Sequence, residues 1–291
     1  MANYPDKVFL NGEIIPSTEA KVSVFDRGFL FGDGIYEVML QINGSYFFGQ
    51  EHLNRLSECL HKINIEYDVT VLPEILKKLV SVSNLEHKDC LIYIQVTRGI
   101  APRKHAFPLD IEPTVMAYAL PFLLPEINDK PISVITQKDF RWHRCDIKMT
   151  SLLGNVMAND WAIKNGHFET VFYRDDKITE ASHSNIFFVK NDVVYTHPAD
   201  ENILNGITRA IVINLCKKNN IEVQEEAIMQ SDLPMVNEAF LTGTSTQIAA
   251  INMIDDHVYI KNNKIGPITK KIQQLFLNLK NSQTKRLPQV S

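Results

Sequence analysis

Alternating apolar and polar positions divide residues 1–120 into strands and helices. Apolar runs flank Asn11-Gly12 and Asn43-Gly44, and because such pairs tolerate the positive φ angles of a tight turn, each predicts a β-hairpin. Leucine and isoleucine then recur at helical spacing, and two later apolar runs predict buried strands. The expected elements are hairpins over 7–15 and 35–48, helices over 51–63 and 71–85, and strands over 90–99 and 113–122.

The pattern changes where three prolines, Pro121, Pro125 and Pro131, fall close together. Each proline fixes its own φ and biases the preceding residue toward extended backbone, which predicts a semi-rigid linker. Beyond it we expect a strand over 132–137, a β meander over 168–198, a helix from about Thr208, a strand-turn-strand over 238–254 and an amphipathic helix over 267–283. We therefore predict a small α/β N-terminal domain over 1–120, a linker over 121–131 and a larger C-terminal domain over 132–291.

The amino-acid composition excludes some classes of binding partner. A net charge of −4, from 30 Lys and Arg against 34 Asp and Glu, gives no basic footprint for nucleic acid or an anionic membrane. No apolar run approaches the ~20 residues that cross a bilayer. The four cysteines, Cys59, Cys90, Cys145 and Cys216, are widely spaced without a C-x-x-C pair, which favours reduced thiols and a cytoplasmic location. We expect small-molecule partners and no metal.

One lysine is the first candidate for chemistry. Lys148 stands between Ile147 and Met149 in a largely apolar stretch. An amine kept from water has its charged form disfavoured, so a nucleophilic neutral amine becomes accessible. The alternative is a lysine that extends its head to solvent.

Two turns are candidate phosphate sites. The segment "ILNGITR" opens a helix at Ile207 and Thr208, whose backbone N–H groups would lie at the positive end of the helix dipole; an ordinary threonine N-cap is the alternative. In "LTGTSTQI", Gly243 allows close backbone approach and Thr244 can donate to phosphate oxygens. A plain turn between strands is the alternative there.

Two further segments could bind charged partners. Glu180 in "TEASHSNIFF" could pair with a protonated ring nitrogen, or it could be a solvated turn glutamate. The loop that contains Arg98, Arg103 and His105 could hold a carboxylate, or it could be a basic surface loop. Together, a phosphate site, two carboxylate-related sites and a special lysine are what a pyridoxal-phosphate enzyme acting on amino acids needs.

The order of motifs resembles that of the class IV aminotransferases, the fold-type IV pyridoxal-phosphate enzymes, and most closely the D-amino-acid aminotransferases. The motifs are "DRGFLFGDGIYE", "EHLNRL", "VTRGIAPRKHAFP", "RWHRCDIKMTSLLGN", "TEASHSNIF", "ILNGITR" and "LTGTSTQI". The resemblance runs nearly end to end. It implies an α+β fold of two domains, the larger with a β-barrel-like core.

The resemblance also implies roles for single residues. Lys148 matches the lysine that holds pyridoxal 5'-phosphate as an internal aldimine and moves the substrate proton, and Glu180 matches the partner of the ring nitrogen. Leu204 matches the residue packed on the ring face. The residues that match the phosphate cup are Arg55, Ile207, Thr208 and Thr244, with Gly243 in place of a serine.

The carboxylate trap implied by the resemblance is formed by Tyr36 and, from the neighbouring subunit, Arg103 and His105. A homodimer with its active site at the subunit interface follows. The expected reaction is transamination of D-amino acids such as D-alanine and D-glutamate with pyruvate or 2-oxoglutarate.

Three alternatives remain open. Two of them belong to the family: aminodeoxychorismate lyase, which eliminates pyruvate, and branched-chain amino acid aminotransferase. The Arg-x-His pair at Arg103 and His105 favours the D-amino-acid enzymes over both. Outside the family, the chain could be a non-catalytic protein that binds a small molecule.

Overall fold

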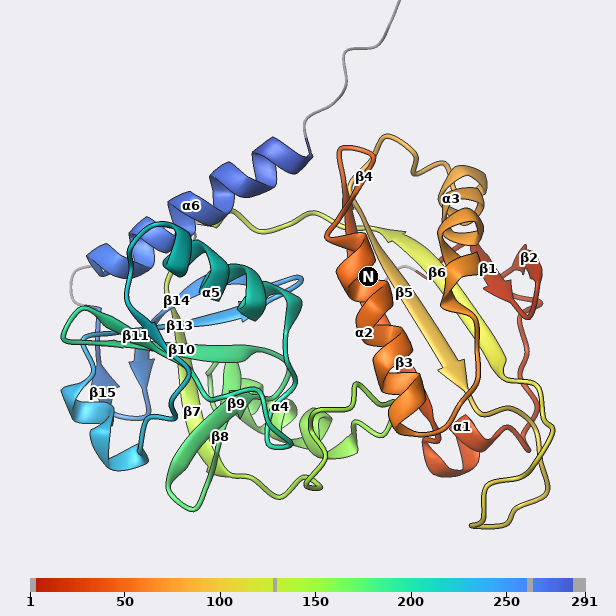
Figure 1. The fold of residues 1–291 in the computed structure, drawn as a ribbon, viewed down its shortest axis with the longest axis horizontal. Helices are drawn as coiled ribbons and strands as arrows, with labels where there is room; N and C mark the ends of the chain where they lie inside the picture. The colour runs from red at the N-terminus through yellow and green to blue at the C-terminus, as the bar shows by residue number, and fades with distance from the viewer. Residues whose placement is uncertain (1–3, 128–129, 261–263, 285–291) are drawn as a thin grey trace, which may run out of the picture. The chain divides into compact units, whose positions relative to one another are not determined.

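The chain folds into two compact units, whose elements are labelled in Figure 1. The computed structural model describes residues 4–127, 130–260 and 264–284. The first unit contains the described residues of Met1–Leu123, Ile147–Ser151 and Gln283–Ser291, and the second those of Leu124–Asp146 and Leu152–Ser282. Residues 128–129, in the expected linker, lie outside the described residues. The short segment Ile147–Ser151 therefore belongs to the first unit, although the chain on both sides of it belongs to the second.

A six-stranded sheet in the order β2-β1-β6-β5-β3-β4 forms the first unit. All of its neighbouring strands are antiparallel. The strands are β1 (Lys7–Leu10), β2 (Glu13–Pro16), β3 (Gly34–Ile42), β4 (Ser45–Phe47), β5 (Cys90–Thr97) and β6 (Thr114–Pro121). The helices are α1 (Arg27–Phe31), α2 (Gly49–Lys62), the 3-10 helix η1 (Val69–Val71) and α3 (Leu72–Val82).

Both predicted hairpins are confirmed. Asn11 and Gly12 turn β1 into β2 with φ of 45° and 99°, and Asn43 and Gly44 turn β3 into β4 with φ of 50° and 80°. Positive φ at both central residues gives a turn whose twist matches that of the flanking strands. The helices predicted over 51–63 and 71–85 and the strands predicted over 90–99 and 113–122 are also present.

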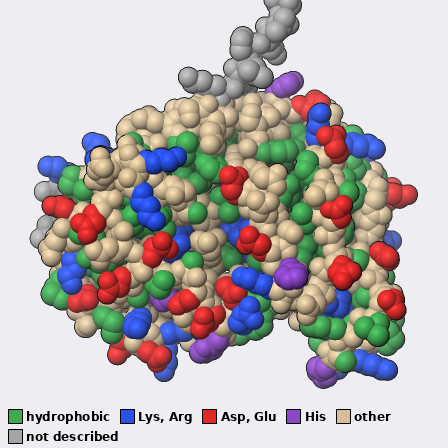
Figure 2. Space-filling model, viewed as in Figure 1, with side chains coloured by type: hydrophobic (Ala, Val, Ile, Leu, Met, Phe, Trp, Pro, Cys, Tyr) green, Lys and Arg blue, Asp and Glu red, His purple; other side chains and the backbone are tan. Residues whose placement is uncertain are grey.

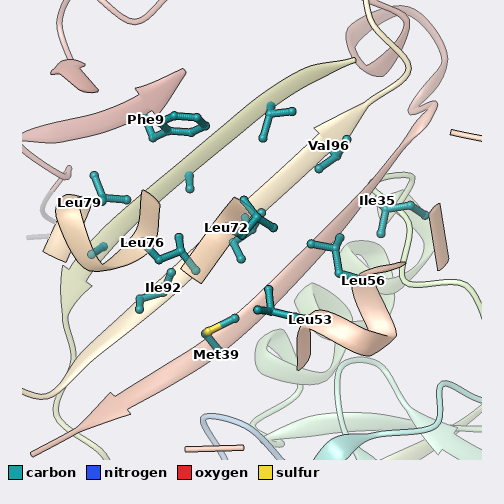
Figure 3. Close-up of a cluster of buried hydrophobic side chains, with 14 of the residues drawn as sticks. Phe9, Ile35, Met39, Leu53, Leu56, Leu72, Leu76, Leu79, Ile92 and Val96 are labelled. Atoms are coloured by element: carbon teal, nitrogen blue, oxygen red, sulfur yellow. The ribbon is translucent and has the colours of Figure 1, made fainter. Parts of the chain in front are cut away.

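The core of the first unit lies between the sheet and helices α2 and α3 (Figure 3). Ile35 and Met39 of β3 point toward the helices, as the period of two in a strand requires. Leu56 of α2 and Leu72 and Leu76 of α3 fill the space above them and are almost fully buried. Burial of such side chains contributes about 1.5–3 kcal/mol each.

A curled nine-stranded sheet forms the second unit, in the order β12-β11-β10-β13-β14-β7-β8-β9, with β15 paired to β14. Its strands are β7 (Ile132–Lys138), β8 (Glu169–Arg174), β9 (Lys177–Ala181), β10 (Asn185–Lys190), β11 (Val193–Tyr195), β12 (Val223–Gln224), β13 (Glu238–Gly243), β14 (Gln247–Ile254) and β15 (His257–Val258). Its helices are α4 (Leu153–Lys164), α5 (Ile207–Lys218), η2 (Gln230–Met235) and α6 (Pro267–Gln283).

The continuous meander predicted over 168–198 is wrong in its pairing. The four strands form, but β8 pairs with β9 and β10 with β11, whereas β10 takes β13 as its other partner. The reason is an apolar match: Phe187 of β10 stacks on Phe240 of β13 with ring centroids 5.0 Å apart. Because β9 and β10 lie at different places in the sheet order and still contact each other, the sheet curls toward a barrel.

The distribution of charge on the surface agrees with the nearly equal numbers of basic and acidic residues in the sequence. Acidic and basic side chains are interspersed on the face shown in Figure 2. Among the described helices, none combines the length and apolar character that a membrane crossing requires.

Candidate active site

Lys148 is held by backbone pairing to β3. The short strand β4 covers only the end of β3 at Leu40–Ile42, which leaves the earlier part of that edge for Lys148–Thr150. Tyr36 N–H donates to the Lys148 carbonyl at 3.0 Å, and Thr150 N–H donates to the Gly34 carbonyl at 2.9 Å. Lys148 N–H donates in turn to Cys59 Sγ at 3.4 Å. The lysine backbone is therefore fixed by strand geometry and not by a helix.

The lysine amine lies over an aromatic ring. Lys148 Nζ is 4.2 Å from the centroid of the Tyr36 ring. Tyr36 stacks on Tyr93, which stacks on Tyr118, with centroid distances of 5.7 Å and 5.0 Å. This row of rings crosses three neighbouring strands and restricts the place where the amine can lie. Two predicted site residues, Lys148 and Tyr36, are thus brought together.

Glu37 is a fully buried carboxylate on the helix-facing side of β3. It accepts hydrogen bonds from Arg55 Nε and Nη2 at 2.9 Å and 2.7 Å and lies 2.9 Å from His52 Nδ1. Burial raises the pKa of Glu37, but the Arg55 charge and the hydrogen bonds of His52 and Arg55 outweigh burial and hold that pKa well below its usual range. Burial lowers the pKa of His52 despite Glu37. Arg55, a predicted phosphate ligand, is therefore oriented by an ionised carboxylate.

Arg98 does not belong to the carboxylate trap suggested by its loop. It donates to both Asp33 oxygens at 2.8 Å and 2.9 Å and to the carbonyls of Asn64 and Ile63. Arg27 donates to the same Asp33 carboxylate at 2.7 Å. Arg98 is buried, so it ties β5 to its surroundings and is not available to a substrate.

Arg103 and His105 lie on the exposed loop after β5. The Arg103 guanidinium is 5.1 Å from the Phe31 ring centroid, and the His105 ring is 5.8 Å from the same ring. Phe31 ends α1, where Gly32 adopts φ 67° as the C-cap. The structure brings these two residues to one aromatic support and leaves their polar groups exposed.

In the second unit, Glu180 collects three donors at the end of β9. Arg141 Nη1 donates to Oε1 at 3.0 Å, while Leu204 N–H and Asn185 Nδ2 donate to Oε2 at 2.9 Å and 3.3 Å. Burial nevertheless raises the pKa of Glu180 to about 7, because it outweighs the Arg141 charge and these hydrogen bonds. The positive charge near this buried carboxylate is therefore too small to keep it fully ionised at neutral pH.

Asp139 holds the arginine that faces Glu180. Arg141 Nε and Nη2 donate to the two Asp139 oxygens at 3.0 Å and 2.9 Å, and Arg174 Nε donates to Asp139 at 2.9 Å. The Arg141 guanidinium also lies 4.2 Å from the centroid of the buried Phe172 ring. Asp139 itself has a pKa below its usual value, because the two arginines outweigh its burial.

The start of α5 has the form of an anion site. Gly206 is the N-cap residue, so no side chain caps the helix there, and Ile207 and Thr208 follow as the first helical residues, with Thr208 buried. A Cβ on Gly206 would lie 2.1 Å from Asn185 Oδ1, so a glycine is required for this close approach. Asn185 donates to the Leu204 carbonyl at 2.8 Å, which ties the turn before α5 to β10 and to Glu180.

The turn from β13 to β14 carries the remaining predicted phosphate ligands, Gly243 and Thr244, both half-buried. A Cβ on Gly243 would lie 3.4 Å from Ser184 Oγ and from Thr246 Oγ1, which is an ordinary contact. Ser184 and Thr246 hydroxyls are themselves 3.4 Å apart. The Ser184 hydroxyl, from the residue before β10, and the Thr246 hydroxyl, from this turn, thus lie beside Gly243.

Sequence reasoning missed four ionisable residues of this arrangement: Glu37, His52, Asp139 and Arg141. A signal for Glu37 exists, since a glutamate interrupts the apolar face of β3 that contains Ile35 and Met39. His52 lies one helical turn before Arg55, which places both on one face of α2. Asp139 and Arg141 give no comparable signal, because Arg141 meets Glu180 39 residues further along the chain and Asp139 meets Arg174 35 residues further along.

Comparison with known proteins identifies the family. The sequence model of the family amino-transferase class IV matches residues 34–254 of this chain. The D-alanine aminotransferase of Staphylococcus aureus strain N315 is 39% identical over 275 residues, which cover 93% of this chain and 96% of that protein. That of Bacillus licheniformis is 39% identical over 281 residues, which cover 96% and 98%.

Solved structures agree on the fold. The branched-chain aminotransferase of the archaeon Thermoproteus uzoniensis matches with a TM-score of 0.82 at 27% identity, over 97% of each chain. That of Escherichia coli matches with a TM-score of 0.87 at 23% identity, over 99% of this chain and 97% of that one. The α+β architecture expected from the sequence is confirmed, and this chain belongs to the class IV aminotransferases.

Proposed function

We propose that this enzyme transfers the amino group of D-amino acids to 2-oxo acids, with pyridoxal 5'-phosphate bound at Lys148. The observation that carries the proposal is the 39% identity, over more than nine-tenths of the chain, to two enzymes that are D-alanine aminotransferases. Fold similarity alone would not distinguish among the activities of the family.

The residues present fit the cofactor. Glu180 is buried with a pKa raised to about 7, and a protonated ring nitrogen would add the positive charge that its surroundings lack. The start of α5 offers backbone N–H groups without a side-chain cap, which suits a phosphate. Arg55, Ile207, Thr208, Gly243 and Thr244 would hold the phosphate, and Leu204 would pack on the ring.

Each side chain then has a limited task. When bound, the cofactor supplies an electron sink for the substrate α-carbon and a carrier for the amino group. Lys148 would hold the cofactor covalently, and once a substrate amine has displaced it, its free amine would carry the proton that leaves the substrate α-carbon. Tyr36, Arg103 and His105 would hold the substrate carboxylate, so that the α-hydrogen faces Lys148 in only one of the two enantiomers. This orientation selects the stereochemistry.

A homodimer completes the site in this proposal. Arg103 and His105 are exposed within a single chain, which suits residues that serve a neighbouring subunit. Helix α4 also exposes large apolar side chains, with Leu153 72%, Val156 58% and Ile163 59% exposed. Apolar side chains gathered on one exposed helix indicate an interaction surface. We propose that a second copy of the chain covers it.

We also propose a cytoplasmic location. All four cysteines are buried and free, as in proteins of a reducing compartment.

The decisive experiment compares amino donors with the purified holoenzyme. Addition of D-alanine or D-glutamate alone should remove the visible absorbance of the bound cofactor, and pyruvate or 2-oxoglutarate should restore it. Lys148→Ala is the control, and it should show neither change. A preference for L-leucine or L-valine would instead support a branched-chain enzyme, and release of pyruvate from aminodeoxychorismate would support the lyase.

The dimer has a separate test. Lys148→Ala and Arg103→Ala should each be inactive alone and regain activity when co-expressed, because a mixed dimer contains one site with both residues intact. Absence of activity in mixed dimers confirmed by mass would place Arg103 in the same site as Lys148 of its own chain.

A further inference from the structure

We propose that Arg141 is a positioning residue that keeps Glu180 ionised and aimed at the cofactor ring nitrogen, so that the shared proton stays on that nitrogen. This inference rests on the proposed function. Arg141 touches neither substrate nor cofactor in this proposal, and it acts only through Glu180.

The contact between the two residues is direct and buried. Arg141 Nη1 donates to Glu180 Oε1 at 3.0 Å, and both side chains are 6% exposed. The other oxygen, Oε2, is occupied by Leu204 N–H and Asn185 Nδ2. The carboxylate is therefore oriented by donors on both oxygens, and Arg141 provides the charge-assisted one.

Arg141 has little freedom to turn elsewhere. Asp139 accepts from its Nε, its Nη2 and its backbone N–H, and Phe172 covers the guanidinium. The charged or titratable groups near Glu180 are Arg141, Asp139 and the Cys145 thiol. Arg174 joins this group by donating a hydrogen bond to Asp139. Arg141 is the only cation among the described residues that donates directly to Glu180.

The chemical consequence follows from competition for one proton. A carboxylate beside a guanidinium is a weaker proton acceptor, so a proton shared with a ring nitrogen remains on the nitrogen. Without Arg141, Glu180 would face the like charge of Asp139, and its burial would favour the neutral carboxylic acid. The ring nitrogen would then lose its proton at a lower pH.

The test measures protonation of the ring nitrogen directly. Holoenzyme loaded with nitrogen-15-labelled pyridoxal phosphate is titrated by NMR from about pH 6 to about pH 9. Arg141→Met should lower the midpoint of nitrogen deprotonation by at least about one pH unit, a tenfold change in the equilibrium. It should also lower kcat by about tenfold or more and raise KM little.

Arg174→Met is the matched control. Arg174 shares Asp139 with Arg141, and within the described part of the chain none of its hydrogen bonds goes to Glu180. Arg174→Met should therefore leave the nitrogen midpoint unchanged even if it loosens the cluster. Arg141→Lys should restore most of the midpoint, because it retains the charge. Arg141→Gln keeps a hydrogen-bond donor without charge, should behave like Arg141→Met, and carries the test if Arg141→Met does not fold.

Three outcomes would overturn the inference: an unchanged midpoint in both neutral variants, an equal shift in Arg174→Met, or an Arg141→Lys midpoint as low as that of the neutral variants. Failure of the parent protein to bind the cofactor at Lys148 would instead overturn the proposed function. The two failures are therefore distinguishable from the parent spectrum.

Discussion

Glu37 in the first unit and Glu180 in the second are both buried carboxylates beside a buried arginine, but their pKa values shift in opposite directions. Arg55 gives Glu37 two hydrogen bonds and His52 lies within hydrogen-bond distance, and the pKa of Glu37 falls well below its usual range. Arg141 gives Glu180 one hydrogen bond, and burial raises the pKa of Glu180 to about 7.

The difference separates a structural carboxylate from one prepared for a ligand. Arg55 and His52 stabilise the ionised form of Glu37 within its own unit, so Glu37 requires no cation from a ligand. Glu180 shares its arginine with Asp139, and it gains from any additional cation that reaches it. A buried carboxylate with a deficit of positive charge is a candidate binding group even when its hydrogen bonds are satisfied.

The largest expected effect is on stability at Glu37. Glu37→Gln removes the negative charge opposite the buried Arg55, and loss of one partner of a buried ion pair costs about 3–5 kcal/mol of unfolding free energy. The control Glu51→Gln lies on the exposed face of α2, the helix that carries Arg55, and should change stability by less than about 0.5 kcal/mol. Urea unfolding of the three proteins measures this. Equal stability of Glu37→Gln and parent would show that the pair is not needed for folding.

The next effect is on activity at Glu180. Glu180→Gln should lower kcat by about 10²–10³-fold, because a neutral amide does not stabilise a protonated ring nitrogen. Its unfolding free energy at neutral pH should not fall, since a neutral side chain suits the buried position. Steady-state kinetics with D-alanine, together with urea unfolding, checks both statements. A variant that retains parental kcat would break the comparison.

The third effect is a pH dependence of opposite character at the two sites. The folded pKa of Glu180 lies above the unfolded value of 4.5, so its ionisation lowers stability as pH rises from 4.5 to about 7. Relative to Glu180→Gln, the apoprotein should therefore lose on the order of 3 kcal/mol over this range.

Glu37 should behave in the other sense. Its folded pKa is depressed, so its contribution is complete above pH 4.5 and is lost only as pH falls through the folded pKa. The stability difference between parent and Glu37→Gln should be flat where that for Glu180→Gln slopes. Unfolding curves from about pH 5 to about pH 8 decide this, and parallel slopes would contradict it.

The smallest expected effect compares Gly206 and Gly243, which lie in the two proposed phosphate-binding turns. Gly206→Ala places a Cβ 2.1 Å from Asn185 Oδ1, so Asn185 must move away from Leu204 and Glu180, and cofactor affinity should fall about tenfold, or 1.4 kcal/mol. Gly243→Ala meets only ordinary contacts of 3.4 Å and should change affinity by less than about threefold. Fluorescence titration of the apoproteins with cofactor compares them. A larger effect at Gly243 would reverse the assignment.

Much of the fold followed from local pattern. The Asn-Gly turns and the apolar spacing of α2 and α3 are short-range signals, and the structure contains the elements they predict. The pairing of β10 with β13 could not be predicted in this way, because the two strands are separated by some fifty residues and periodicity carries no information about partners.

Some residues of the candidate site could likewise be predicted from the sequence, and others could not. Motifs could point to Lys148, Glu180 and Thr208 because their neighbours in sequence are distinctive. Asp139 and Arg141 could not be found in this way, since each acquires meaning only when the fold buries it beside Glu180 or Arg174. Arg98 shows the converse error, because its place in a basic loop suggested substrate binding whereas Asp33 and two carbonyls engage it.

The pairing of Lys148–Thr150 with β3 means that residues 1–123 alone do not make up the first unit. A cut at the boundary between Leu123 and Leu124 would leave the N-terminal fragment without the segment that covers the first half of β3. Unpaired N–H and C=O groups of a bare strand edge template association with other chains. The isolated fragment 1–123 should therefore aggregate, and a peptide that spans the lysine segment should suppress that aggregation by occupying the same edge.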